Sequence, residues 1–203
     1  GLIILNPIML TIAVIIIFLK IFNISFETYN KGGHLIEFWL KPAIVALGVP
    51  LYLQLRTIRK QLLPIILSQL AGCVVGIVSV VLIAKAIGAG REIILFLAPK
   101  SVSSPIAMEI ASAVGGIPSL AVAVVIFVGL FGGILGFKIL QLLMIKSPIA
   151  QGLSIGTASH VMGTLAAMDI SRRYGAYASI GITVNGILTA NCNTTILKWI
   201  GYL

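Results

Sequence analysis

The sequence contains few charged residues, and this scarcity excludes a soluble globular protein. Only 9% of its 203 residues are charged, whereas an average soluble domain has about 25%. Hydrophobic residues make up 59%. The apolar runs Leu2–Phe22 and Leu62–Ile83 approach or exceed the roughly 18 to 20 residues that a helix needs to cross a bilayer. The composition therefore predicts an integral membrane protein, embedded in the lipid bilayer.

Metal ligands and catalytic motifs are also scarce. Cys73 and Cys192 lie apart in apolar segments and form no CxxC or metal-binding pattern. His160 has no second His, Cys or acidic cluster at metal-ligand spacing, so zinc is not expected. Ser159 adjoins His160 in the sequence but has no orienting acid nearby, which argues against an intramembrane hydrolase of the Ser-His-acid type. We expect no enzyme activity, no cofactor and no metal.

Acidic residues are few, and the net charge is +9. The basic residues lie mostly in short segments between apolar runs, where they set membrane orientation, so we expect no nucleic-acid partner. The loop Arg56–Gln61 carries three positive charges and no negative one, which predicts the cytoplasmic side.

Five apolar segments are expected to cross the membrane or approach it. Because Leu2–Phe22 has no basic n-region and no cleavage site, it is predicted to be a spanning helix and not a signal peptide. An aqueous loop is expected at Asn23–Gly33. The apolar segment Leu35–Leu55 follows it, with proline breaks at positions 42 and 50. The clearest further spans are Leu62–Ala86, with Gly72 and Gly76 suited to close helix approach, Ser119–Phe137 and Tyr177–Leu197.

Two polar, interrupted units stand between these spans: Pro99–Pro118 and Ser147–Ala167. Such segments are tolerated at membrane depth where they are enclosed by protein or line a wet cavity. If each unit dips into the bilayer and returns, the basic loops all fall on one face. The predicted fold is therefore an all-α, multi-pass helical bundle with discontinuous or re-entrant helices. Opposed broken units are typical of inverted-repeat transporters.

The first unit offers an anion site around Lys100. This lysine either extends to the lipid headgroups or binds a carboxylate, with help from a half-helix that starts near Pro105. Glu109, one turn into that half-helix, is either a proton-coupling group or a partner for Lys100. The candidate substrate-binding residues of this unit are Lys100, Ser101, Ser103 and Ser104.

The second unit offers His160, which is either a hydrogen-bonded packing group or part of a substrate or proton path. Asn185 either bonds to a neighbouring helix or lines the same path. The candidate residues here are Thr157, Ser159, His160, Thr164 and Asn185. We expect Ser103, Ser104 and Glu109 to approach His160 and Thr157 near the middle of the membrane.

Motifs across nearly the whole chain resemble those of the LrgB/CidB family. They are KPAIVALGVPLY from Lys41, PKSVSSPIAMEI from Pro99, GLSIGTASHVMGT from Gly152 and GAYASIGITVNGI from Gly175. The resemblance implies one LrgB-like domain over residues 1–203, shortened by a first hydrophobic segment that members generally have. It also implies a bacterial inner-membrane protein.

Two functions follow from this resemblance. One is transport of a small monocarboxylate such as pyruvate or glycolate, since the family includes pyruvate carriers and is related to the plastid glycolate/glycerate exchanger. The other is antiholin-like regulation of murein hydrolase activity and lysis, together with an LrgA/CidA-like partner. The glycine-rich spans are also compatible with a homodimer.

Overall fold

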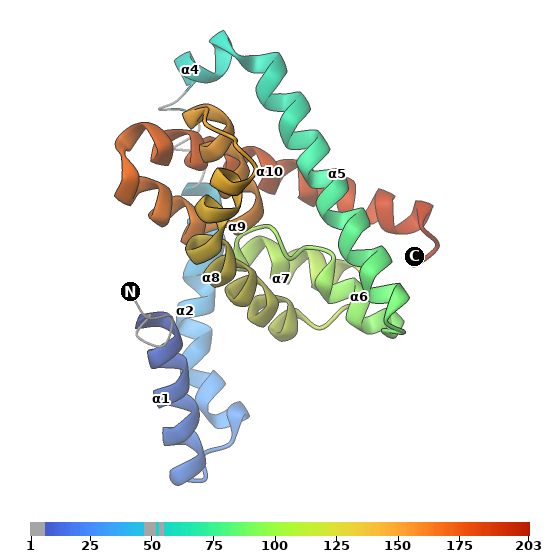
Figure 1. The fold of residues 1–203 in the computed structure, drawn as a ribbon. Helices are drawn as coiled ribbons and strands as arrows, with labels where there is room; N and C mark the ends of the chain where they lie inside the picture. Colours follow the sequence, from blue (N-terminus) through green and yellow to red (C-terminus); the bar gives the residue numbers. More distant parts are fainter. Residues whose placement is uncertain (1–6, 47–51, 53–54) are drawn as a thin grey trace. The chain divides into compact units, whose positions relative to one another are not determined.

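The computed structural model of the chain describes residues 7–46, 52 and 55–203. Every regular element in these residues is helical (Figure 1), which confirms the expected all-α class for this part of the chain. The contacts divide the chain into two units, Gly1–Ala46 and Leu47–Leu203, and each unit is treated by itself below.

The first unit contains α1 (Pro7–Ile21) and α2 (Phe26–Ala46). The predicted loop Asn23–Gly33 is wrong beyond Ser25, because α2 begins at Phe26. Ser25 caps this helix: its Oγ accepts a hydrogen bond from the backbone N–H of Thr28 at 3.2 Å. The predicted break at Pro42 is also wrong, since α2 continues through this residue. Membrane helices tolerate such prolines. The expected break at Pro50 lies outside the described residues.

The second unit contains the other helices, among them the short helix α4. It runs from Leu55 to Lys60, so that most of the segment predicted as a loop is helical. Arg59 and Lys60 lie in its last turn, where positive charge interacts favourably with the helix dipole. The remaining helices are α5 (Leu62–Ala86), α6 (Arg91–Leu97), α7 (Ser104–Ala113), α8 (Pro118–Leu142), α9 (Pro148–Ile170) and α10 (Arg172–Trp199).

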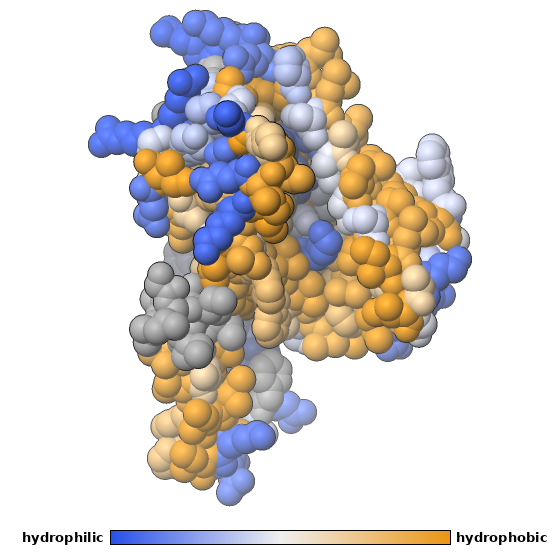
Figure 2. Space-filling view, viewed as in Figure 1, coloured by the Kyte–Doolittle hydropathy of each residue, from blue (hydrophilic) through white to orange (hydrophobic). Residues whose placement is uncertain are grey.

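Among the described residues, α5 and α8 are the two helices that are long and apolar enough to cross a membrane, with mean hydropathies of 2.5 and 2.6. This agrees with the predicted spans Leu62–Ala86 and Ser119–Phe137, although α8 continues to Leu142. In Figure 2, hydrophilic residues gather at the end of α5 that adjoins α4, and much of the remaining visible surface of this unit is hydrophobic. Apolar spans and an apolar surface indicate a membrane protein.

Helix α9 contacts both α8 and α10 and is packed most extensively against α10. Glycines permit this approach. A Cβ atom at Gly156 of α9 would overlap the backbone of Ala178, and one at Gly181 of α10 would lie 2.6 Å from the carbonyl oxygen of Leu153. On the α8 side, a Cβ atom at Gly132 would overlap Ser159. Close packing thus holds α9 in the interior of this unit.

Candidate functional site

Helix α9 is broken at His160. This residue has φ 41° and ψ −127°, so that α9 consists of two helical stretches joined at a kink. Residues other than glycine rarely adopt a positive φ, and such backbone strain persists only where the surroundings enforce it. His160 is 3% exposed, and its Nε2 lies 2.8 Å from the carbonyl oxygen of Val125 on α8. A discontinuous helix is therefore present where the second polar unit was predicted.

The first polar unit is also interrupted. Helix α6 ends at Leu97, and α7 begins at Ser104 with Pro105 in its first turn, which agrees with the predicted half-helix start. Ser103 occupies the N-cap position but makes no side-chain capping bond. Its Oγ is buried without a hydrogen-bond partner among the residues described. The segment between these helices carries Lys100 and Ser101.

A cavity of about 360 Å³ lies between α5, the segment after α6, and α9. It lies wholly within the second unit. Its polar lining comes from three separate parts of the sequence: Ser68 and Gln69, then Lys100 and Ser101, then Ser154 and Thr157. Small and apolar residues complete the wall, including Gly72 and Gly76 of α5. This volume lies within the usual range of small-molecule sites, about 300–1,000 Å³.

Lys100 contributes the positive charge of this cavity. The side chain is partly buried, and its Nζ donates a hydrogen bond to Ser101 Oγ at 2.8 Å. Within residues 7–46, 52 and 55–203, no carboxylate forms an ion pair with this amine. An ammonium group has three N–H donors, so two remain for another acceptor. Because carboxylates form strong charge-assisted hydrogen bonds with such groups, the cavity is chemically suited to an anion.

Asn185 joins the two polar units. Its Nδ2 donates to the carbonyl oxygen of Ser101 at 2.9 Å and lies 3.4 Å from that of Thr157. The Thr157 hydroxyl lies 2.5 Å from Oε1 of Gln69 and 2.7 Å from the carbonyl oxygen of Leu153. Residues from α5, the segment after α6, α9 and α10 therefore meet in one hydrogen-bonded network.

The predicted residues fall into two groups. Lys100, Ser101 and Thr157 line the cavity, and Asn185 is bonded to two of them. Ser159, His160 and Thr164 are buried but are not part of its lining. Ser159 and His160 instead face glycines of α8, and the Thr164 hydroxyl donates to the carbonyl oxygen of His160 at 2.8 Å.

Glu109 lies on the exposed side of α7, while Ala107, Ile110 and Ala111 of that helix are buried. Among the described residues it forms no ion pair with Lys100. Ser103 is buried and Ser104 is partly buried, but neither lines the cavity. Among the described residues none of these three side chains hydrogen-bonds to His160 or Thr157, and the first unit is joined to Thr157 through Ser101 and Asn185.

Sequence analysis did not identify Gln69, Ser68 or Ser154. A signal for Gln69 was available, because a Ser-Gln pair at positions 68 and 69 interrupts an otherwise apolar span. The structure places this part of α5 against α9, since a Cβ atom at Gly72 would lie 3.0 Å from Thr157 Cγ2. In the part of the chain described, no three His, Cys, Asp or Glu side chains form a group that could hold a metal ion.

Comparison with known proteins gives a consistent result over the length of the chain. The model of the LrgB-like family matches residues 1–199. An antiholin-like protein LrgB from Bacillus mycoides (strain KBAB4) is 34% identical over 201 residues, which are 99% of this chain and 87% of that protein. Proteins of the same name from Bacillus cereus (strain B4264) and Bacillus anthracis (strain CDC 684 / NRRL 3495) are 33% identical over the same shares. No solved structure matches the chain. The chain belongs to the LrgB-like family.

Proposed function

We propose that this chain is a transporter, or a transporter subunit, for small monocarboxylates such as pyruvate or glycolate. The observation that carries the proposal is the Lys100 amine on the wall of a cavity that also carries Ser, Gln and Thr side chains, without a carboxylate partner among the described residues. Even partial burial of a cation without a counter-ion costs free energy. An anionic substrate would supply the missing charge.

The neighbouring groups could orient such an anion. Ser101 Oγ lies next to the Lys100 amine, and Gln69 and Thr157 line the same cavity. The Gln69 Nε2 atom makes no hydrogen bond within the part of the chain described, so its N–H groups are available. A carboxylate held by Lys100 could place its second polar group, a keto or hydroxyl oxygen, near this amide. A site with the Lys100 amine and the Gln69 amide would favour small 2-oxo and 2-hydroxy acids, because these acids carry a second oxygen next to the carboxylate.

The arrangement of basic residues supports a membrane orientation. Arg56, Arg59 and Lys60 precede α5, and Lys146 precedes α9. By the positive-inside rule these helices would start at the cytoplasmic face of the inner membrane. The cavity is lined by residues from the earlier part of both helices, 68–76 of α5 and 150–158 of α9. We therefore propose a multi-pass protein whose cavity faces the cytoplasm.

A second function is favoured by the names of the relatives, which are called antiholin-like proteins. Under this function the chain regulates murein hydrolase activity and lysis through a small LrgA/CidA-like membrane partner. The names favour it over transport, while the charged cavity favours transport. The two functions differ in whether the purified chain moves a carboxylate.

Uptake of radiolabelled pyruvate and glycolate into proteoliposomes distinguishes them. The wild-type protein is expected to accumulate at least one of these acids, and Lys100→Ala is expected to abolish uptake. Lys138→Ala is the matched control, because Lys138 is exposed on α8 and does not line the cavity. If no small monocarboxylate enters, with or without the LrgA/CidA-like partner, the antiholin-like function is the better account.

A further inference from the structure

Helix α10 buries a polar face that continues beyond the cavity. Asn185, Thr189 and Asn193 recur every four residues, so they lie on one side of the helix, and their exposed fractions are 1%, 2% and 0%. At about 1.5 Å of rise per residue, this face extends about 12 Å from the first residue to the last. It starts at Asn185, which is bonded to Ser101 at the cavity.

The polar groups on this face are poorly satisfied. Both side-chain polar atoms of Asn193, and Oδ1 of Asn185, are buried without a hydrogen-bond partner among the described residues. Thr189 has a weak partner, since its Oγ1 lies 3.4 Å from Cys73 Sγ of α5. Buried amides are normally paired. Leaving the Asn193 amide unpaired costs free energy that an apolar residue at this position would not cost. The presence of asparagine here therefore requires an explanation.

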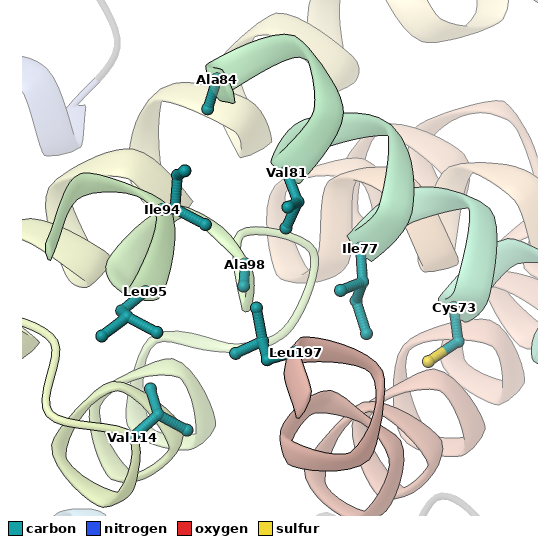
Figure 3. Close-up of a cluster of buried hydrophobic side chains, with 9 residues drawn as sticks. All are labelled: Cys73, Ile77, Val81, Ala84, Ile94, Leu95, Ala98, Val114 and Leu197. Atoms are coloured by element: carbon teal, nitrogen blue, oxygen red, sulfur yellow. The ribbon is translucent and has the colours of Figure 1, made fainter. Parts of the chain in front are cut away.

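Next on the same side of α10 is Leu197, where the polar face ends in an apolar cluster. Leu197 packs with Ile77 and Val81 of α5 and with Leu95 of α6. Figure 3 shows Leu197 of α10 opposite Cys73, Ile77 and Val81 of α5. All of these side chains are buried. The polar face thus joins the cavity at one end and a closed apolar cluster at the other.

We propose that this face of α10 is the far half of the anion's path, with Asn193 as a second polar subsite. The inference rests on the proposed transport function and extends it. In the conformation seen here, the path is closed by the cluster around Leu197. When α5 and α10 separate at that cluster, the amide of Asn193 and the hydroxyl of Thr189 would hydrogen-bond the carboxylate, or the water that accompanies it, as it leaves the cavity. Polar residues inside a membrane bundle commonly mark such pathways.

The test replaces Asn193 by leucine and measures transport and binding separately. Asn193→Leu removes two unpaired polar atoms at similar volume, so it is expected to fold and to unfold at an equal or higher temperature. The rate of uptake of labelled pyruvate or glycolate into proteoliposomes should fall by roughly a factor of ten or more. Binding of the same acid to the purified protein should change by less than about twofold, well under that factor.

Two further variants act as controls. Asn193→Ser keeps a hydrogen-bonding group and should retain most of the transport. Asn191→Leu makes the same chemical change at an exposed position of α10, where Asn191 Nδ2 bonds only to the carbonyl oxygen of Ile187, at 2.7 Å, among the described residues, and it should leave transport unchanged.

Three outcomes would overturn the inference. Wild-type uptake by Asn193→Leu would mean that the amide is merely tolerated, and equal loss in Asn193→Ser would mean that shape matters and polarity does not. Loss of binding in Asn193→Leu would place its effect at the cavity. The failure of the proposed function is distinguishable, because the unaltered protein would then neither bind nor transport the acid.

Discussion

Asn185 Nδ2 donates a hydrogen bond to the carbonyl oxygen of Ser101 across a sequence separation of 84 residues. Because the same amide also lies 3.4 Å from the carbonyl oxygen of Thr157, one side chain fixes both polar units at the cavity. Asn185→Ala would leave buried carbonyl groups without this donor. We expect a loss of about 1–3 kcal/mol in the free energy of unfolding, measured by denaturant titration in mixed micelles. An unchanged stability would show that the two units do not depend on this residue.

The contact between Gln69 and Thr157 gives a prediction with an internal control. Thr157→Val keeps the shape of the side chain but removes the hydroxyl that lies 2.5 Å from Gln69 Oε1. An amide oxygen left unpaired costs about 1–3 kcal/mol, whereas replacing both partners by apolar groups can be nearly neutral. The double variant Gln69→Leu/Thr157→Val should therefore be more stable than Thr157→Val alone. Additive losses in a double-mutant cycle would contradict this pairing.

At His160 we expect glycine to be more stable than alanine, the reverse of their order in a regular helix. In a regular helix, Gly is less stable than Ala by roughly 0.5–1 kcal/mol. At His160 the backbone φ is 41°, which favours glycine, and such strain costs about 1–3 kcal/mol for other residues. Both His160→Gly and His160→Ala lose the contact with Val125, so their difference isolates the backbone. The glycine variant should have the higher unfolding temperature; the opposite order would mean that α9 is not broken there.

Close packing of α9 against α10 predicts that Gly156→Ala is destabilising. The added methyl group would overlap the backbone of Ala178, and overpacking of this kind costs about 1–3 kcal/mol. Gly32→Ala in α2 is the control, since a Cβ atom there meets nothing within 4 Å. It should be neutral or stabilising. Thermal unfolding of the two variants checks the contrast, and equal effects would contradict the packing.

Sequence patterns located the long apolar helices but not their orientation about their own axes. Leu62–Ala86 was predicted with its observed ends, because its length and apolar character are sufficient evidence. The position of Glu109 could not be predicted in this way. Its helix is apolar on several sides, so the pattern does not separate the face that packs on protein from the face that is exposed.

Only some of the residues that line the cavity could be predicted from the sequence. Lys100, Ser101 and Thr157 were expected because polar residues in broken, apolar segments are costly unless they have a role. Gln69 was missed because it lies in a regular helix, where one polar residue can face any neighbour. Its place at the cavity depends on how α5 packs against α9, a long-range contact that the local pattern does not contain. The error at Asn23–Gly33 was local, since the capping role of Ser25 was overlooked.

Binding of pyruvate or glycolate to the purified protein, compared between wild type and Lys100→Gln, tests the central claim most directly. A charge-assisted hydrogen bond contributes about 1.5–3 kcal/mol. Its loss should therefore weaken binding by about ten- to a hundredfold, while the exposed-site control Lys138→Gln should bind as the wild type does. Equal affinity of the wild type and Lys100→Gln, or no binding of any small monocarboxylate by the wild type, would contradict an anion site at Lys100.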